Sequence, residues 1–475
     1  MRVRAPSQAF PLISPTICAL GAWLLTDAAA AESLRVGPGQ TYATPCAAVA
    51  AASPNAEILI APGTYTDSCA LSVPGLTLRG VDGRPKIDLS GTDHPAQYKG
   101  IYVVTADSVT LENLELSGAH ISAQNGENAA AIRLEGQGLT VRRCFIHDNQ
   151  NGILGGSAGT LTVEYSEFFR NGMGNGCSGG GCTHNLYIGK IDTLFFRYNW
   201  SHGIAQDTSD KGHLLKSRAA KNYIEYNRIS GEDAADSYEI DLPNGGLAVL
   251  IGNVIQKGPA SGNTVLFSWG EEGVEHPDQR VFAVNNTFIN ARPSGTFIHA
   301  QGATLTAKNN LLVGAGAPSS TGNLSSDNLS GIDPHFVDGS AYDYHLRADS
   351  PAIGKAVAAG MADAYALIPS AEYLHPNGRT ARATAEDVGA FEFATKLPPD
   401  PSQDGAVDAD AGSAASDAGA PQPGVDPSSP APTSGARQAD GGCAVRQQGS
   451  TGAGSLLALA LGWVWLWRRR RSATG

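Results

Sequence analysis

Ionisable and aromatic residues gather in three short segments near the middle of the chain. These segments are Asn185–Gly189, Leu214–Arg218 and Tyr238–Leu242. Side chains of a β-strand alternate between two faces, so Ile188, Leu215 and Ile240 are expected to point inward. The outward side chains are then Tyr187, Lys216, Glu239 and Asp241. If the segments are adjacent strands, about 4.8 Å apart, these outward groups form one patch.

The residue types in this patch suit the cleavage of a uronic acid polymer by β-elimination. That reaction needs a base for the C5 proton, an acid for the departing 4-oxygen and a cation beside the carboxylate. We expect Lys216, with Arg218 beside it, to be the base, and Tyr187 or His184 to be the acid. Carboxylate oxygens are typical ligands of Ca²⁺. The expected Ca²⁺ ligands are Glu239, Asp241 and Glu271.

A groove that binds a sugar chain also needs an aromatic platform with polar groups around it. The expected substrate-binding residues are Asn185, His213, Asn244 and Trp269. Two other functions would use the same residues. In a glycoside hydrolase, Glu239, Asp241 and Glu271 would supply the paired carboxylates. Lys216 and Arg218 would then only hold the substrate. In a non-enzymatic adhesin, the patch would bind a glycan without any reaction.

A repeated pattern of two short strands around a small residue predicts how the segments are placed. It occurs eight times between residues 109 and 316, with spacings of 22 to 33 residues. Such a period is typical of a solenoid, in which each coil covers the hydrophobic face of the next. The predicted fold class is all-β, a right-handed parallel β-helix with loops at one corner that build the groove. The small residues are Asn113, Cys144, Ser166, Asn199, Asn227, Asn253, Asn286 and Asn310.

Asparagine suits the sharp turn between the two strands of each repeat. It tolerates the left-handed backbone conformation, and its amide can bond the asparagine of the neighbouring coil. We therefore expect a ladder of asparagines along the solenoid. A short, alanine-rich helix over Thr44–Ala52 should cover the N-terminal end, with Thr44 as N-cap and Pro45 in the first turn.

The cysteines indicate an oxidising compartment. The expected disulfides are Cys46–Cys69 and Cys177–Cys182. A metal site made of Cys177, Cys182 and His184 is the alternative for the second pair. Cys144 is expected to be a small buried residue.

The two ends of the chain read as sorting signals around one folded domain. Arg2 and Arg4, an apolar stretch and four alanines at 28–31 predict a signal peptide over residues 1–31. The β-helix domain is predicted over residues 32–396, followed by an open linker rich in Pro, Ala, Ser and Asp over residues 397–442. The remaining residues 443–475 include an apolar stretch, Gly449–Trp467, that is long enough to span a bilayer, and four arginines expected to stay cytoplasmic.

The order of stalk, Gly442-Cys443, apolar helix and arginine cluster resembles the C-terminal sorting signal of myxobacterial surface proteins. The resemblance implies that the protein is secreted and retained at the cell surface. The 33 Lys and Arg against 45 Asp and Glu give a net charge of −12, which disfavours nucleic acid as a partner. The expected partners are a polysaccharide substrate and, through the C-terminal segment, a membrane; the chain is expected to be a monomer.

Two further resemblances concern the fold and the reaction. The helix at Thr44 and the following Ala56–Tyr65 resemble the N-terminal cap and first coil of pectate-lyase-like β-helix proteins. Gly212–Ala219 resembles the Lys-Ser segment of the alginate lyase and chondroitinase B family of β-helix enzymes. In that family a lysine is the base, an arginine on the next coil assists the leaving oxygen, and calcium neutralises the uronate. The resemblance implies that Lys216 is the base, with Arg218 as the nearest substitute for the arginine.

Overall fold

The computed structural model describes residues 32–172, 183–205, 212–232, 234–322 and 324–393. The predicted signal peptide, linker and C-terminal sorting segment lie outside these ranges, as do Cys177 and Cys182. Among the described residues, no helix has the length and apolar character needed to cross a membrane.

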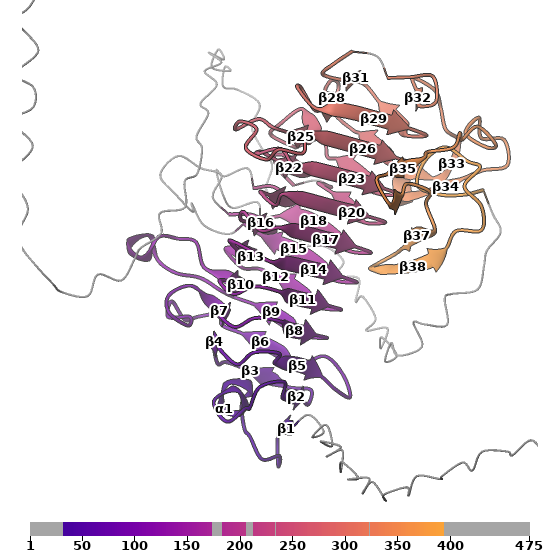
Figure 1. Cartoon of the computed structure of the whole chain (residues 1–475). Coiled ribbons are helices and arrows are strands. Elements are labelled where there is room, and N and C mark those ends of the chain that lie inside the picture. Colours follow the sequence, from indigo (N-terminus) through magenta and orange to yellow (C-terminus); the bar gives the residue numbers. More distant parts are fainter. Residues whose placement is uncertain (1–31, 173–182, 206–211, 233, 323, 394–475) are drawn as a thin grey trace, which may run out of the picture.

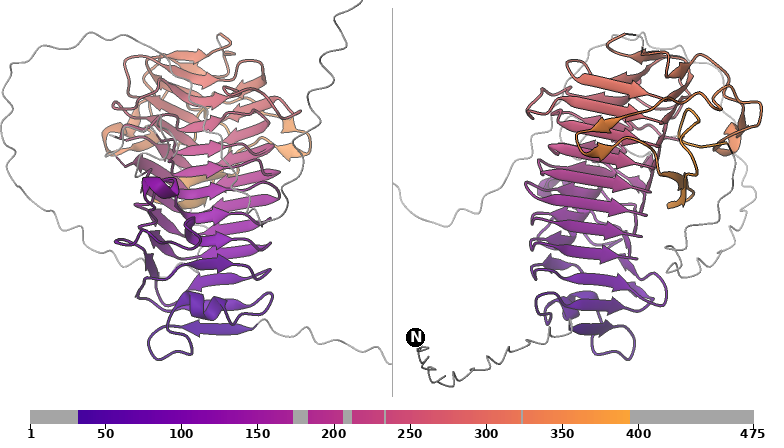
Figure 2. Two further views of the ribbon diagram at one scale, coloured as in Figure 1. Left: turned by 90° about the vertical axis from the view of Figure 1, so that its left-hand side faces the viewer. Right: turned by 45° about the vertical axis from the view of Figure 1, so that its right-hand side comes forward.

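Three long parallel sheets form the walls of a right-handed β-helix (Figure 1). Each complete coil gives one strand to each sheet, so neighbours within a sheet are three strands apart in chain order. The coils stack evenly from the N-terminal end upward (Figure 2). We name the walls sheets A, B and C.

In each repeat, the strand before the small residue belongs to sheet A and the strand after it belongs to sheet B. Its strands are β1 (Ser33–Val36), β2 (Glu57–Ile60), β5 (Thr77–Gly80), β8 (Val109–Glu112), β11 (Leu139–Arg142), β14 (Thr160–Glu164), β17 (Thr193–Arg197), β20 (Lys221–Glu225), β23 (Leu247–Ile251), β26 (Arg280–Val284) and β29 (Thr304–Lys308). The strands of sheet B are β3 (Thr64–Tyr65), β6 (Lys86–Asp88), β9 (Glu115–Ser117), β12 (Phe145–His147), β15 (Glu167–Asn171), β18 (Trp200–Ile204), β21 (Arg228–Ser230), β24 (Val254–Lys257), β27 (Thr287–Asn290), β30 (Leu311–Gly314) and β32 (Leu329–Ser330).

Sheet C is the wall that carries the three segments singled out from the sequence. Its strands are β4 (Cys69–Leu71), β7 (Gly100–Val104), β10 (Ala130–Leu134), β13 (Asn151–Gly155), β16 (Leu186–Ile188), β19 (Leu215–Ser217), β22 (Ile240–Leu242), β25 (Val265–Trp269), β28 (Thr296–His299) and β31 (Ala317–Ser319). The core lies between the three walls, where inward side chains of successive coils stack in register. Leu111, Val141 and Val163 form one such column, and each is completely buried.

A ladder of asparagine amides follows the corner between sheets A and B. Nδ2 of Asn199 donates to Oδ1 of Asn227 at 3.1 Å, and the same bond continues through Asn253, Asn286 and Asn310. Cys144 and Ser166 occupy the equivalent places in the two preceding coils, and Cys144 is completely buried. The predicted ladder is confirmed for these residues, as is the burial of Cys144.

The predicted backbone conformation of the ladder residues is wrong. The left-handed position is the residue before each ladder residue, for example Tyr198 at φ 59° and Tyr226 at φ 55°. Asn113 is itself left-handed at φ 54°, and its amide bonds the carbonyls of Gly80 and Gly83. Leu114 therefore takes the ladder place in that coil, and the asparagines recur for their amides, not for their φ angle.

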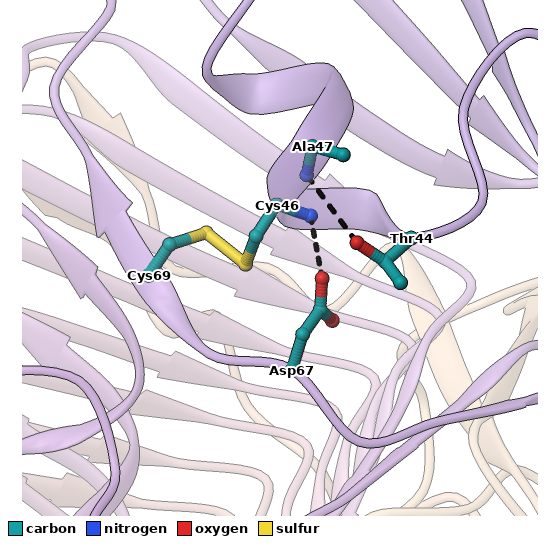
Figure 3. Close-up of a disulfide and its surroundings, with 5 residues drawn as sticks. All are labelled: Thr44, Cys46, Ala47, Asp67 and Cys69. Atoms are coloured by element: carbon teal, nitrogen blue, oxygen red, sulfur yellow. Dashed lines mark hydrogen bonds between the residues drawn. A yellow bond between two sulfur atoms is a disulfide. The ribbon is translucent and has the colours of Figure 1, made fainter.

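A short helix and a disulfide close the N-terminal end of the solenoid. Helix α1 (Pro45–Val49) begins after Thr44, whose hydroxyl accepts a hydrogen bond from the backbone N–H of Ala47 at 3.4 Å. Cys46 in α1 is bonded to Cys69 in β4, as predicted, with 5.8 Å between the Cα atoms (Figure 3). The carboxylate of Asp67 accepts the backbone N–H of Cys46 at 2.8 Å, so the helix is fixed to the first coil from two directions.

The segment after sheet B's last strand folds back along the side of the β-helix (Figure 2). Tyr365 bonds Arg197 at 3.2 Å on sheet A, and Tyr344 bonds Gln256 at 2.8 Å on sheet B. The segment therefore covers the corner between these two walls and leaves the outer face of sheet C to other residues. The short elements outside the walls are η1 (Ala123–Asn125), β33 (Phe336–Asp338), η2 (Gly339–Ala341), β34 (Asp343–Leu346), β35 (Met361–Ala362), β36 (Tyr365–Ala366), β37 (Ala371–Leu374) and β38 (Gly378–Ala381).

Candidate functional site

Tyr187, Lys216 and Asp241 form one column on the outer face of sheet C. Tyr187 of β16 pairs with Lys216 of β19, which pairs with Asp241 of β22. Ser268 of β25 and His299 of β28 continue the column on the next two coils. The inward neighbours Ile188, Leu215 and Ile240 are completely buried. The predicted alternation is confirmed for these residues, whereas Glu239, also predicted to point outward, is completely buried.

A carboxylate links the two cations of this patch. Nζ of Lys216 lies 2.8 Å from Oε1 of Glu272, and Nη2 of Arg218 lies 2.6 Å from Oε2 of the same residue. Nζ of Lys216 also lies 3.5 Å from Oδ2 of Asp241. The guanidinium Nε of Arg218 donates to the hydroxyl of Tyr187 at 2.9 Å. Lys216, Arg218, Tyr187 and two carboxylates therefore form one connected group.

Arg218 is held from several sides, so its guanidinium has little freedom. Its Nη1 donates a hydrogen bond to Oδ1 of Asn244. The amide Nδ2 of Asn244 in turn donates to Oε1 of Glu275 at 3.0 Å. The ring of His276 contacts the backbone carbonyl of Arg218 through Nε2 at 3.0 Å. Asn244, predicted to bind the substrate, thus lies beside Arg218 and orients its guanidinium.

Two histidine rings stack at the start of β16 and β19. The rings of His184 and His213 lie 4.7 Å apart, and Nδ1 of His184 accepts the backbone N–H of His213 at 2.9 Å. Burial lowers the pKa of His213 well below its usual value, and the charges of His184 and Lys216 act in the same direction. Because Nδ1 of His213 accepts the backbone N–H of Tyr238 at 3.3 Å, the neutral ring carries its proton on Nε2.

The carboxylates of this group differ in their tendency to hold a proton. Burial raises the pKa of Asp241 to about 6, although Lys216 opposes that change. Burial acts in the same direction on Glu272, but hydrogen bonds and charge from Lys216 and Arg218 outweigh it and leave the pKa of Glu272 below its usual value. Near neutral pH, Glu272 is thus the firmly ionised member, and Asp241 is close to its titration range.

The sequence predicts Glu271 as a site residue, whereas in the structure its neighbour Glu272 contacts the two cations. Both residues lie in the turn after β25, between Gly270 and Gly273, which take left-handed φ angles of 82° and 102°. Strand alternation does not apply in a turn, so sequence spacing does not indicate which carboxylate faces the cations. In the structure, Oε1 of Glu271 lies 3.0 Å from Nε2 of His299, and Glu271 does not contact Lys216.

The three carboxylates predicted as Ca²⁺ ligands do not come together. Glu239 is completely buried and contacts Lys257, whereas Asp241 contacts Lys216 and Glu271 contacts His299. Across the described part of the chain, no group of three or more His, Cys, Asp or Glu side chains is arranged to hold a metal ion. Because each of the three carboxylates contacts a different basic side chain, they do not fit a Ca²⁺ site.

Glu239 belongs to a separate cluster behind the patch. Nζ of the fully buried Lys257 lies 3.0 Å from Oε2 of Glu239 and 3.7 Å from Oδ2 of the buried Asp236. It also donates to the carbonyl of Ser237 at 2.5 Å and to the hydroxyl of Ser261 at 2.9 Å. The cluster fixes the residues just before β22, and burial raises the pKa of Glu239 well above its usual value.

The prediction that Trp269 and Asn185 bind the substrate is wrong, because both side chains lie inside the β-helix. Trp269 is 1% exposed, pairs with inward Leu242, and donates its indole N–H to the carbonyl of Gly246 at 2.8 Å. Asn185 is completely buried, and its Oδ1 accepts the amide of Asn171 at 3.0 Å in a second internal ladder. Neither side chain can contact a sugar on the outer face.

The described residues also contain a hollow of about 500 Å³ beside the N-terminal cap. Its lining includes Gly37–Gln40, Ala43, Thr44 and Gly63–Thr66, without a charged side chain. It contains none of the predicted site residues, so the outer face of sheet C remains the place where ionisable groups converge.

Comparison with known proteins agrees with this architecture. The family model described as right handed beta helix region matches residues 86–187. A crystal structure of pectate lyase Pel9A aligns with a TM-score of 0.53 and 17% identity, over 77% of this chain and 98% of that chain. The protein is therefore a right-handed parallel β-helix protein with a pectate-lyase-like fold.

Two further solved structures align with lower TM-scores. Alginate lyase from Paenibacillus sp. str. FPU-7 gives a TM-score of 0.39 and 18% identity, over 60% of this chain and 95% of that chain. Pectin methylesterase from Aspergillus niger gives a TM-score of 0.28 and 17% identity, over 65% of this chain and 93% of that chain. No curated protein sequence matches this chain.

Proposed function

We propose that this protein is a polysaccharide lyase that cleaves a uronic-acid-containing polymer by β-elimination at the outer face of sheet C. The observation that carries the proposal is that Lys216 and Arg218 each contact one oxygen of the Glu272 carboxylate, at 2.8 and 2.6 Å. A uronate presents the same planar, two-oxygen group, which a guanidinium and an ammonium bind through charge-assisted hydrogen bonds. The likeness in fold to a pectate lyase supports a polysaccharide as the substrate.

Neutralisation of the uronate carboxylate is assigned to Arg218. Its guanidinium is permanently charged and is already oriented by Tyr187 and Asn244. Removal of the C5 proton leaves negative charge on the carboxylate oxygens, so a fixed cation beside them stabilises the transition state more than the ground state. The carboxylates predicted as Ca²⁺ ligands are paired elsewhere, so no step is assigned to a metal.

Lys216 is assigned as the base and Tyr187 as the acid. Nζ of Lys216 lies 5.4 Å from the centre of the Tyr187 ring, so both groups reach the same sugar unit. In the reaction the Lys216 ammonium first gives a proton to the Asp241 carboxylate, whose Oδ2 lies 3.5 Å from Nζ. The free amine then takes the C5 proton, the electron pair forms the C4–C5 double bond, and the C4–O4 bond breaks. The Tyr187 hydroxyl, which accepts a hydrogen bond from Arg218, has its own proton to give to the departing oxygen.

The stacked histidines are assigned to positioning. His213 is 8% exposed and presents Nε2 toward Asp241 at 3.7 Å, so it supports the carboxylate beside Lys216 and does not itself reach the sugar. His184 in turn accepts the backbone N–H of His213. We further propose that the protein works at the cell surface after export, as the two terminal segments of the sequence indicate.

The test is the ultraviolet absorbance of unsaturated sugars during incubation of the purified protein with alginate, pectate, glucuronan and glycosaminoglycans, with calcium and with a chelator. Elimination alone creates the conjugated double bond, so absorbance that rises with one polymer supports the proposal. New reducing ends without absorbance would replace it with hydrolysis by paired carboxylates. Tight glycan binding without any product would replace it with an adhesin.

A further inference from the structure

A carboxylate of the protein itself occupies the cation pair of sheet C. The side chains of Lys216 and Arg218 are only 6% and 11% exposed, whereas that of Glu272 is 31% exposed. Glu272 therefore covers the two cations from the solvent side. Each of its oxygens takes one cation, which is the arrangement that an incoming planar carboxylate would need.

We propose that Glu272 is an internal substitute for the substrate carboxylate, so that the free protein is self-inhibited and a uronate binds by displacing the Glu272 side chain. The inference rests on the proposed function and adds to it how the site is regulated and what it selects. Glu272 is thereby a specificity-determining residue and takes no part in the proton transfers.

Charge balance in the buried site explains the selection. Lys216 and Arg218 face two carboxylates, Glu272 and Asp241, so the group is neutral when all four are ionised. Replacing the carboxylate of Glu272 with that of a uronate keeps this balance. If a neutral sugar or a methyl-esterified uronate displaced Glu272, Lys216 and Arg218 would face only one carboxylate, that of Asp241, and the unbalanced positive charge would be costly in a largely desolvated site.

Displacement requires rotation of one side chain and leaves the backbone of the turn in place. The backbone N–H of Glu272 donates to the carbonyl of Pro243 at 3.0 Å, and that of Gly270 donates to Leu242 at 2.9 Å. That of Glu275 donates to Asn244 at 3.0 Å, so the turn is anchored to the strand below on both sides of Glu272. The glutamate side chain has three rotatable bonds and already borders solvent, where its charge is hydrated once it leaves the cations.

Glu271 gives a matched control in the same turn. It has the same side chain, the same local backbone and an ionic contact of its own, at 3.0 Å to His299. Substitution of Glu271 changes the net charge near the site by the same amount as substitution of Glu272, but leaves the cation pair occupied. A difference between Glu271→Gln and Glu272→Gln therefore reports on displacement and not on long-range charge.

The experiment uses acetate as a minimal carboxylate probe of the purified protein, with binding followed by calorimetry and by NMR of the Arg218 Nε–H group. Glu272→Gln should bind acetate about 10- to 100-fold more tightly than the unsubstituted protein, because a competing charged partner has been removed. Glu271→Gln should stay within about 3-fold. Glu272→Ala, with equal thermal stability, should follow Glu272→Gln. Equal tightening in the Glu271 and Glu272 variants, or none in either, overturns the inference.

A second measurement separates displacement from a purely structural role. Saturating acetate should move the pKa of Glu272, followed by carboxylate NMR, upward toward its ordinary value, because acetate takes over Lys216 and Arg218. An unchanged pKa overturns the inference. Cleavage of the polymer panel is scored separately. Tighter acetate binding without cleavage keeps the inference and removes the lyase, whereas cleavage with no effect of Glu272→Gln on acetate removes the inference alone.

Discussion

Replacing Lys257 with methionine should destabilise the whole β-helix, because it leaves two buried carboxylates without their cation. Lys257, Glu239 and Asp236 have no solvent exposure, and Nζ of Lys257 lies 3.0 Å from Glu239 and 3.7 Å from Asp236. Methionine preserves most of the volume of the stem, so the change is mainly electrostatic. The test needs no knowledge of the substrate.

The magnitude follows from burial. Removing one partner of a buried ion pair costs about 3–5 kcal/mol of unfolding free energy, since the remaining charge stays uncompensated. Two hydrogen bonds from Nζ, to the carbonyl of Ser237 at 2.5 Å and the hydroxyl of Ser261 at 2.9 Å, are lost as well. Lys99 is the matched control. Its pair with Glu135, at 2.6 Å, has side chains 39% and 34% exposed, so Lys99→Met should cost about 1 kcal/mol or less.

Urea unfolding of Lys257→Met, Glu239→Gln and the double variant gives the assay. The double variant should lose less than the sum of the single losses, because Glu239→Gln removes the charge that Lys257→Met strands. Burial already raises the pKa of Glu239 in the folded protein above the ordinary 4.5. In Lys257→Met the folded state therefore binds this proton more tightly than the unfolded state, so the deficit should shrink as pH falls toward 4.5 from above and change little below that value.

Equal losses in Lys257→Met and Lys99→Met would refute this reasoning. The same holds for a Lys257→Met deficit that does not change with pH, since an uncompensated buried carboxylate must respond to protonation. A loss of stability that is strictly additive in the double variant would show that Glu239 is not the group Lys257 neutralises.

The remaining predictions concern the site and the cap. Lys216→Ala should lower turnover about 10²- to 10⁴-fold on the polymer that is cleaved, whereas Lys190→Ala, whose pair with Glu275 is half exposed, should stay within a few-fold of wild type. Because the folded pKa of Asp241 is about 6 against an ordinary 3.8, wild-type stability should fall as pH rises between these values. Asp241→Asn should lack that slope in thermal unfolding. Replacing Cys46 and Cys69 with alanine removes a link across 23 residues and should cost about 2–4 kcal/mol in urea unfolding.

The solenoid could be predicted from sequence because its period and its alternation are local properties. Ile188, Leu215 and Ile240 follow strand alternation, and all three are completely buried. Adjacent coils then bring Tyr187, Lys216 and Asp241 into one column. The same rule, carried one strand further, places Trp269 opposite inward Leu242. The prediction of Trp269 as a sugar platform is therefore wrong, because its register with Leu242 turns the indole into the core.

The rest of the site depends on turns and corners, where spacing does not determine direction. Glu271 and Glu272 are identical residues in one turn, and only the path of the chain after β25 decides which one reaches Lys216. Asn185 directly precedes β16, yet the bend there turns its amide into an internal ladder. Glu239 has the outward parity of Asp241, but the residues before β22 enclose it together with Lys257.

The return of the C-terminal segment along the side of the β-helix determines where a mechanical load enters the molecule. The backbone N–H of Gly389 donates to the carbonyl of Asn309 at 2.9 Å, and that of Ala390 donates to the hydroxyl of Thr287 at 2.9 Å. Tension applied beyond residue 393 therefore pulls on the flanks of β27 and β30, in the upper half of the stack (Figure 1). The force is thus shared by the two neighbouring coils of β27 and β30 and does not act first on the last strand, β32, so pulling at this end should not unwind the β-helix from its end.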